Sequence, residues 1–421
     1  MDTDSIIEVA YALDTFYFLV SGAFVMWMAA GFTMLEAGMV RTRSTVEILT
    51  KNIGLYSIAC IMYLLVGYNL MYSEGVGALI PSIDGIVSGG DHASGDVAAS
   101  DGALYYSALS DFFFQVVFVA TAMSIISGAV AERMKLWSFL AFAVILTGFI
   151  YPIQGYWSWG GGFLDQMGYL DYAGSGIVHF TGAVAALAGV LLLGPRNGKY
   201  TSDGKVHALP GANLPLATLG TFILWLGWFG FNGGSELKVS DVESANAVAQ
   251  VFTNTNTAAA GGAVAALVTS RLLFGRADLT MALNGALAGL VSITAEPLMP
   301  EPLLATVIGA IGGVIVVFAI LGFDRIRIDD PVGAISVHGV AGIWGVLAVL
   351  LSNPDATLGG QLLGLVTIGV FVFTAALAIW ALLKITIGIR LTEEEEEVGA
   401  DVTECGLEAY PEFTRSSTMT R

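Results

Sequence analysis

Two histidines and one aspartate carry ionisable groups into or beside long apolar stretches of this sequence. Asp171 lies directly before an apolar run, and His179 follows it by eight residues. A helix rises ~1.5 Å per residue, so His179 would lie ~12 Å along the helix, inside hydrocarbon if the helix spans a bilayer. His338 lies in a second such run, ISVHGVAGIWGVLAVLL. Ionisable side chains at that depth are expensive and usually functional.

The composition indicates a polytopic membrane protein. Of 421 residues, 55% are hydrophobic and only 12% are charged, which excludes a soluble fold. The N-terminal sequence MDTDSIIEVAYALD has no basic region, so we expect no cleaved signal peptide. The two cysteines, Cys60 and Cys405, are far apart and predict neither a disulfide framework nor a metal site.

Eleven windows of about twenty mostly apolar residues predict eleven transmembrane helices. They cover 15–38, 52–73, 108–131, 137–156, 173–194, 212–232, 245–270, 279–298, 302–323, 333–352 and 360–389. With the N-terminus outside, every Lys and Arg except Lys238 falls in an inner segment. Omitting one span would exchange the sides of all later loops and destroy this asymmetry. The prediction is therefore an all-α integral membrane protein with the N-terminus out and the C-terminus in.

An odd number of spans in each half predicts an inverted repeat of five plus five helices. The repeats would cover about 15–196 and 210–352 of a membrane domain at 1–390, with 360–389 as an extra helix. An acidic cytoplasmic tail would follow at 391–421. His179 and His338 then lie on the last spans of the two repeats, and we expect them to meet near mid-membrane.

The net charge of −18 argues against binding nucleic acid or anionic lipid. Acidic residues collect on both faces of the predicted bundle, which favours adaptation to high salt over the alternative, a funnel for cations.

Several interpretations of the histidines stay open. A single buried histidine can simply be hydrogen-bonded to a carbonyl. Two facing imidazoles that share a proton would suit a small solute that gives and accepts hydrogen bonds, and equally a proton relay. Two ligands are too few for zinc, and no haem arrangement is present, so we expect no metal or cofactor. Asp171 itself could be the N-cap of the helix that carries His179.

Aromatic residues from three segments could form an outer vestibule. They are Phe114 and Phe118 in DFFFQVVFVATAMS, Trp159, and Trp228 and Phe231, which precede Ser235 in LGWFGFNGGS. Aromatic faces attract cations. An interfacial aromatic belt is the alternative explanation.

Five motifs resemble those of the ammonium transporter family, Amt/Mep/Rh, and more closely its ammonium transporter branch. They are WGGGFLDQMGYLDYAGSGIVH, SGAVAERMKLWSF, WLGWFGFNGGS, IDDPVGAISVHGVAGIWG and GADVTECGLEAYP. The resemblance covers nearly the whole chain and keeps the order of the motifs.

The resemblance implies a role for each candidate residue. Trp159, Phe114 and Ser235 would recruit ammonium, with Asp171 supporting recruitment or deprotonation; Phe118 and Phe231 would be the stacked gate; His179, His338 and Trp228 would line the pore. It further implies a homotrimer in the plasma membrane and a PII-type signalling protein at the cytoplasmic face. The family tail commonly has His where this chain has Cys405, which leaves tail regulation open.

Desolvation supports the same substrate. A bare cation passing imidazoles and phenyl rings would lose its water without a countercharge, which costs many kcal/mol. Ammonium, with methylammonium as its analogue, can release a proton and cross as a neutral amine, whereas potassium cannot. An ammonium sensor that signals through its tail is the alternative. A membrane enzyme is disfavoured, because the sequence has no hydrolytic, nucleotide-binding or metal motif.

Overall fold

Long apolar runs give this chain its helices. In hydrocarbon every backbone N–H and C=O needs an internal partner, and a continuous helix supplies one. The computed structural model describes residues 3–203 and 205–413. In this part of the chain there is no strand, only three isolated bridges. Nine helical segments in it are long and apolar enough to cross a membrane, and two shorter apolar ones accompany them.

The first half of the chain forms five apolar helical segments. α1 and α5 are continuous, whereas the second, fourth and fifth segments each contain a short π-helical turn. Their bounds are α1 (Thr3–Met39); α2 (Thr45–Met62), η2 (Tyr63–Gly67) and α3 (Tyr68–Met71); α5 (Ala108–Ala129); α6 (Leu136–Ile145), η3 (Leu146–Ile150) and α7 (Tyr151–Trp157); and η4 (Ser175–Phe180) with α9 (Thr181–Leu193). The short helices η1 (Thr42–Ser44), α4 (Ser94–Ala99) and α8 (Phe163–Gln166) lie in the connections.

The second half forms six more apolar segments and the tail. The segments are α10 (Leu214–Gly234), α11 (Val242–Phe274), α12 (Leu279–Thr294), α13 (Pro302–Arg325), the sequence η5 (Ile335–Val340), α14 (Ala341–Ala348) and η6 (Val349–Leu351), and α15 (Leu358–Thr386). The tail contains α16 (Glu393–Val398), α17 (Ala400–Cys405) and η7 (Pro411–Phe413). Each of the eleven predicted windows therefore contains an apolar helical segment, but α1 begins twelve residues before its window. Hydropathy marks only the apolar part of a helix that continues through polar turns.

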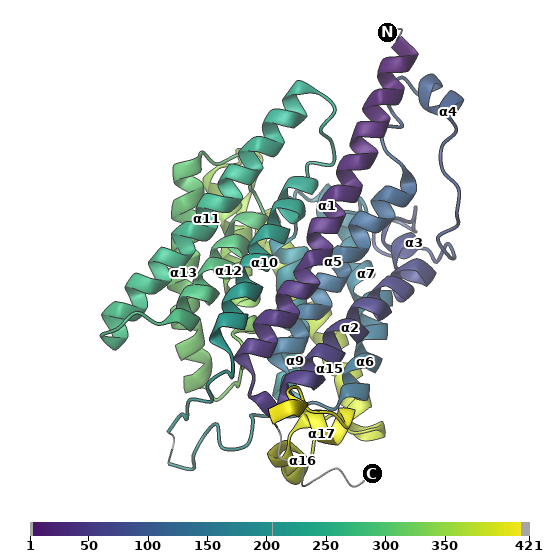
Figure 1. Ribbon diagram of the computed structural model, residues 1–421. Helices are drawn as coiled ribbons and strands as arrows, with labels where there is room; N and C mark the ends of the chain where they lie inside the picture. Colours follow the sequence, from purple (N-terminus) through teal and green to yellow (C-terminus); the bar gives the residue numbers. More distant parts are fainter. Residues whose placement is uncertain (1–2, 204, 414–421) are drawn as a thin grey trace.

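The helices pack in two groups with related neighbours. α2 packs against α5 and α6 in one group, and α11 packs against α12 and α13 in the other, with α1 and α10 packed together between them (Figure 1). The contacts in the second group repeat those in the first group, five apolar segments further along the chain. Glycines allow α1 and α10 to approach closely: a Cβ at Gly38 would lie 2.4 Å from the Ala217 backbone N, and one at Gly220 would lie 2.3 Å from that of Leu35.

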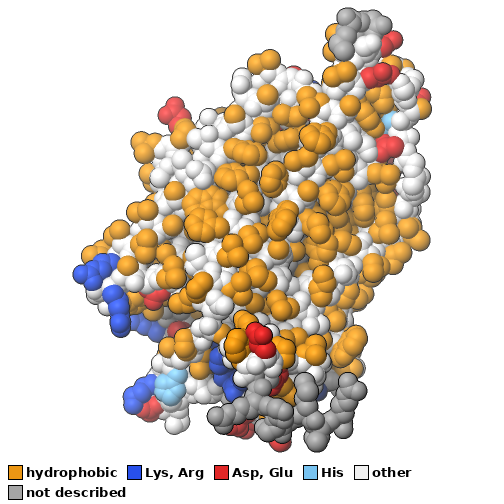
Figure 2. Space-filling view, viewed as in Figure 1, with side chains coloured by type: hydrophobic (Ala, Val, Ile, Leu, Met, Phe, Trp, Pro, Cys, Tyr) orange, Lys and Arg blue, Asp and Glu red, His pale blue; other side chains and the backbone are white. Residues whose placement is uncertain are grey.

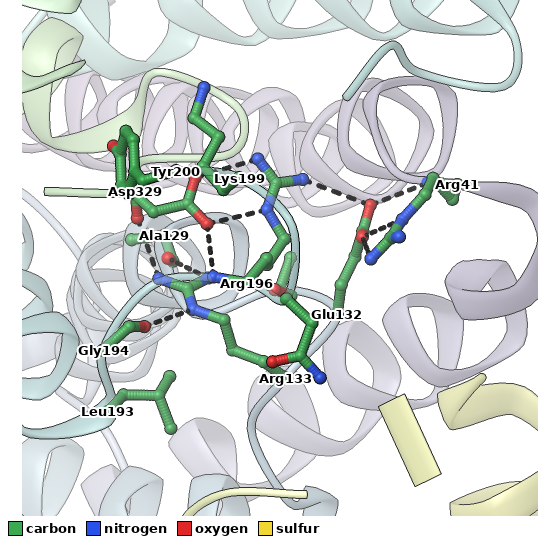
Figure 3. Close-up of polar contacts among 12 residues, drawn as sticks. Arg41, Ala129, Glu132, Arg133, Leu193, Gly194, Arg196, Lys199, Tyr200 and Asp329 are labelled. Carbon is green, nitrogen blue, oxygen red and sulfur yellow. Dashed lines mark hydrogen bonds and ion pairs between the residues drawn. The ribbon is translucent and has the colours of Figure 1, made fainter. Parts of the chain in front are cut away.

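A buried ion-pair network joins the two halves at one end of the bundle (Figure 3). The Arg196 guanidinium donates to both oxygens of Asp329, at 2.8 and 2.9 Å, and lies 3.3 Å from Oε1 of Glu132. Glu132 also pairs with Arg41, and Arg133 donates to the Asp329 carbonyl at 2.8 Å. Burial alone would raise the pKa of Asp329, but Arg196 and Arg133 outweigh it and hold that pKa below its usual range.

The described part of the tail packs on the same end of the bundle. α16 and α17 lie below the start of α2, opposite the start of α1 (Figure 1). Asp401 accepts a hydrogen bond from the Glu47 backbone N–H at 2.8 Å, and Glu404 accepts one from Leu136 at 2.8 Å. In the space-filling view, hydrophobic side chains cover the middle of this face, and Lys and Arg side chains gather toward the tail end (Figure 2). Residues 414–421 of the predicted tail lie outside the described residues.

Candidate functional site

The two predicted histidines lie side by side in the middle of the bundle. His179 is in η4 and His338 is in η5, and both are buried, with 0% and 3% of their surfaces exposed. Their Nδ1 atoms are 3.1 Å apart, and the ring centroids are 5.1 Å apart. One Nδ1 must carry the hydrogen and the other must accept it, because two lone pairs or two N–H groups would repel. Nε2 of His179 is buried without a hydrogen-bond partner among the described residues.

An aspartate eight residues before each histidine caps the helix that carries it. Asp171 Oδ2 accepts hydrogen bonds from the backbone N–H groups of Gly176 and Ile177, at 2.9 and 2.8 Å, and Oδ1 accepts one from Gly174 at 3.1 Å. These bonds satisfy free backbone N–H groups at the start of η4, as an N-cap side chain would, although the N-cap position itself is occupied by Gly174. Burial raises the pKa of Asp171 to about 6, against the lowering effect of these donors.

Asp330 is the counterpart of Asp171 in the second half, and the sequence interpretation did not include it. Its Oδ2 accepts from the backbone N–H groups of Ile335 and Ser336, at 3.0 and 3.1 Å, and its Oδ1 is buried without a partner among the described residues. Burial raises the pKa of Asp330 to about 6. The signal was present, because the spacing from Asp330 to His338 equals that from Asp171 to His179.

An aromatic stack leads to the histidine pair. The rings of Phe118 and Phe231 have centroids 4.2 Å apart, and Phe231 lies 5.2 Å from the His179 ring. Trp228 stacks on His179 at 4.9 Å, and its Nε1–H donates to Thr294 Oγ1 at 2.8 Å. All three aromatic side chains are buried. The closed stack leaves no room for a hydrated ion in this arrangement.

Beyond the stack lies a cavity of about 410 Å³, which we name the outer cavity. Phe114, Phe118, Trp159 and Ser235 line it, so four of the predicted residues come together there. The sequence interpretation missed further lining residues with polar tips, namely Tyr68, Tyr72, Tyr106, Asp111, Gln115 and Tyr172. Tyrosines in loops and helix ends resemble an ordinary interfacial belt, so their convergence left no signal in the sequence.

Asp171 lines a neighbouring cavity of about 390 Å³ and not the outer cavity. Trp159 lines both, and its Nε1–H donates to the backbone carbonyl of Asp171 at 2.9 Å. Asp171 therefore contacts the predicted recruitment site through its main chain, while its carboxylate faces the start of η4.

Two cavities lie on the opposite side of the histidines. A small one of about 10 Å³ has His338 and Glu36 in its wall. A larger one of about 120 Å³, the inner vestibule, is lined by Arg196, Lys199 and Asp330 among others. Outer cavity, aromatic stack, histidine pair, small cavity and inner vestibule thus follow one another across the bundle.

Comparison with known proteins identifies the family. The model of the Ammonium Transporter Family matches residues 16–410. Ammonium transporter Amt2 of Archaeoglobus fulgidus is 38% identical, over 96% of this chain and 90% of its own length. Ammonium transporter Amt1 of Haloferax mediterranei is 36% identical, over 97% of this chain and 81% of its own.

Solved structures show the same fold. A Sensor Amt Protein superposes with a TM-score of 0.86 at 34% identity, over 94% of this chain and 99% of that one. Mep2 from Candida albicans superposes with a TM-score of 0.82 at 25% identity, over 99% of this chain and 94% of that one. The relatives from Archaeoglobus fulgidus and Haloferax mediterranei are named as ammonium transporters, and the first of the two structures is named as a sensor. This chain is a multi-pass membrane protein that belongs to the ammonium transporter family.

Proposed function

We propose that this protein moves ammonium across the plasma membrane by separating it into ammonia and a proton. Ammonium enters the outer cavity between Trp159, Phe114 and Ser235, where aromatic faces and a hydroxyl replace part of its water. It loses a proton there, the proton takes a separate or coupled route, and ammonia passes Phe118 and Phe231 and then the two histidines. The observation that carries this proposal is the placement of the buried His179–His338 pair between an outer and an inner cavity.

Desolvation makes the route selective. The stack and the histidine pair provide no formal negative charge, so a bare cation entering them would pay a large desolvation penalty. Potassium cannot avoid that penalty, whereas ammonium avoids it by leaving a proton behind. A pair of neutral imidazoles offers ammonia both a donor and an acceptor.

Asp171 supports recruitment in this proposal by positioning other groups. Its carbonyl orients Trp159, and its carboxylate holds the turn that carries His179. Trp228 lines the pore beside His179 and is itself oriented by Thr294.

We further propose that all eleven apolar segments cross the membrane, with the N-terminus outside and the C-terminus inside. The clustering of Lys and Arg toward the tail end supports this orientation (Figure 2). By resemblance to the family we propose a homotrimer and a PII-type partner at the inner face. Cys405 stands within 3.7 Å of Thr50 Oγ1 in the docked tail, so the substituted position takes part in tail packing.

An ammonium sensor is the second candidate. It is favoured by the likeness to the Sensor Amt Protein and by the tail, which packs directly on α2. Deleting residues 391–421 separates the two functions. If the protein is a transporter, the shortened protein still conducts ammonium, at the same or a changed rate. If it is a sensor, the shortened protein loses its cytoplasmic signal even when the ammonium flux is unchanged.

Liposomes that contain the purified protein test transport directly. We expect an ammonium gradient to drive a current or a change in luminal pH, and an equal potassium gradient to drive neither. His338→Gln should abolish the response, and His92→Gln should not, because His92 lies in the connection between α3 and α4, outside the pore. Equal responses to ammonium and potassium, or none to either, would overturn the proposal.

A further inference from the structure

Glu36 is a buried carboxyl at the inner end of the pore to which the transport proposal gives no role. It lies near the end of α1, only 1% of its surface is exposed, and it lines the small cavity together with His338. Apart from Asn284, the other residues in the wall of this cavity are apolar. His338 and Glu36 are therefore the two groups in the wall that can hold a transferable proton.

The hydrogen-bond partners of Glu36 are neutral. Ser127 Oγ lies 2.6 and 2.7 Å from the two carboxyl oxygens, and Asn52 donates to Oε2 at 2.9 Å. None of the ion pairs among the described residues includes Glu36. The charged groups that act on it electrostatically are Lys51 and Glu47, which form an ion pair at 2.5 Å and so add no net charge.

The number of available hydrogens shows which protonation state of Glu36 fits these contacts. The Ser127 hydroxyl also lies 2.7 Å from the Ser124 carbonyl oxygen, which can only accept. Ser127 has one hydrogen, so it cannot donate both to that carbonyl and to an ionised carboxylate. If Oε1 of Glu36 carries a proton, it donates to Ser127, Ser127 donates to Ser124, and Oε2 accepts from Asn52, which leaves only the contact between Ser127 and Oε2 without a hydrogen. The site thus accommodates a carboxylic acid that can give up and regain a proton.

The small cavity connects Glu36 with His338 and with the inner vestibule. Its volume of about 10 Å³ is close to the roughly 10–15 Å³ that one water needs. Asn284, Val332 and Gly333 line both this cavity and the inner vestibule. One water could therefore bridge His338 and Glu36, and the vestibule begins at the same wall.

We propose that Glu36 is the proton-exchange group at the inner end of the pore, which re-forms ammonium from ammonia that has passed His338. The O–H bond of Glu36 breaks and an N–H bond of ammonium forms, which leaves a carboxylate. A proton from the histidine pair, originally released by ammonium in the outer cavity, then restores the acid. This inference rests on the proposed transport function and adds that the proton crosses with ammonia.

The test is to measure current and luminal pH in the same liposomes. Wild-type protein should give an ammonium-driven current with little luminal alkalinisation. Glu36→Gln preserves the size of the side chain and removes the exchangeable proton. We expect its current to fall at least tenfold while ammonia still enters and raises the luminal pH. Asp14→Asn is the matched control, since Asp14 is a buried carboxyl at the other end of α1 with backbone and hydroxyl donors, and its current-to-alkalinisation ratio should stay at the wild-type value.

Each alternative result has a defined meaning. Glu36→Gln could give the same ratio of current to alkalinisation as wild type, or could lose both signals equally. Either result would mean that Glu36 serves only in packing, and would overturn the inference. Wild-type alkalinisation without current would overturn it too, but would leave ammonia conduction standing. The absence of both signals in wild type would overturn the transport function itself.

Ser127→Ala provides a second variant in case Glu36→Gln does not fold. It keeps the carboxyl but removes its hydroxyl partner, and it should shift the dependence of the current on luminal pH. The groups facing Glu36 that carry charge or titrate, namely Lys51, Glu47 and His338, are unchanged in this variant. An unaltered pH profile would count against Glu36.

Discussion

Replacing Asp171 distinguishes a capping carboxylate from a catalytic base. An Asn at this position can place its oxygen where Oδ2 lies and keep the bonds from Gly176, Ile177 and the Tyr169 hydroxyl. Its NH2 group then faces the Gly174 N–H, so one hydrogen bond is lost and two donors meet. We expect a loss of about 1–3 kcal/mol of stability. Asp171→Ala instead strands three backbone N–H groups, and we expect it to lose at least about 3 kcal/mol.

The same bonds position His179, so transport should follow the cap. Misplacing a functional group by 1 Å can reduce a rate about 100-fold. We therefore expect Asp171→Ala to reduce the transport rate about 100-fold, and Asp171→Asn to keep the rate within about tenfold of wild type. Stability is measured by thermal unfolding in detergent, and flux by the ammonium-driven current in liposomes. If Asp171→Asn is folded at the assay temperature but has no flux, the negative charge itself is required and the reasoning fails.

Three further variants test other parts of the pore. Asp330→Asn should change stability by less than about 1 kcal/mol, because an NH2 group can replace the partnerless Oδ1 without loss of a hydrogen bond. A larger loss of stability in thermal unfolding would contradict the cap geometry. Phe231→Ala should lower stability by about 3–5 kcal/mol and let a potassium gradient drive a current; an unaltered exclusion of potassium would show that the stack is not the barrier. Asp329 has a lowered pKa in the folded state, so its stabilising effect is full at neutral pH and is lost as the pH falls below about 4. Asp329→Asn should cost about 3–5 kcal/mol at pH 7 by stranding Arg196, and its melting temperature should vary less between pH 5 and pH 3 than that of wild type.

Much of the fold follows from hydropathy. Each of the eleven predicted windows contains an apolar helical segment, because a bilayer-spanning helix must be continuously apolar over about twenty residues. Polar extensions carry no such requirement, so the start of α1 at Thr3 was not predicted. The acidic run of the tail shows a similar limit. The sequence predicted an acidic tail but not which of its carboxylates are buried: Glu396 is buried and pairs with Arg390. Only the packed tail brings that arginine to it.

The sequence by itself determined which side chains could do chemistry. Two histidines could be recognised at corresponding places in two apolar runs, each eight residues after an aspartate. They could be recognised because the constant rise of a helix converts spacing along the chain into depth in the membrane. Which way each group points was decided only by the tertiary structure. Asp171 faces backbone amides, and Glu36, near the end of α1, reaches the cavity beside His338. Glu36 and His338 line one cavity although they lie 302 positions apart in the sequence, and no local pattern encodes a distance that helix packing sets.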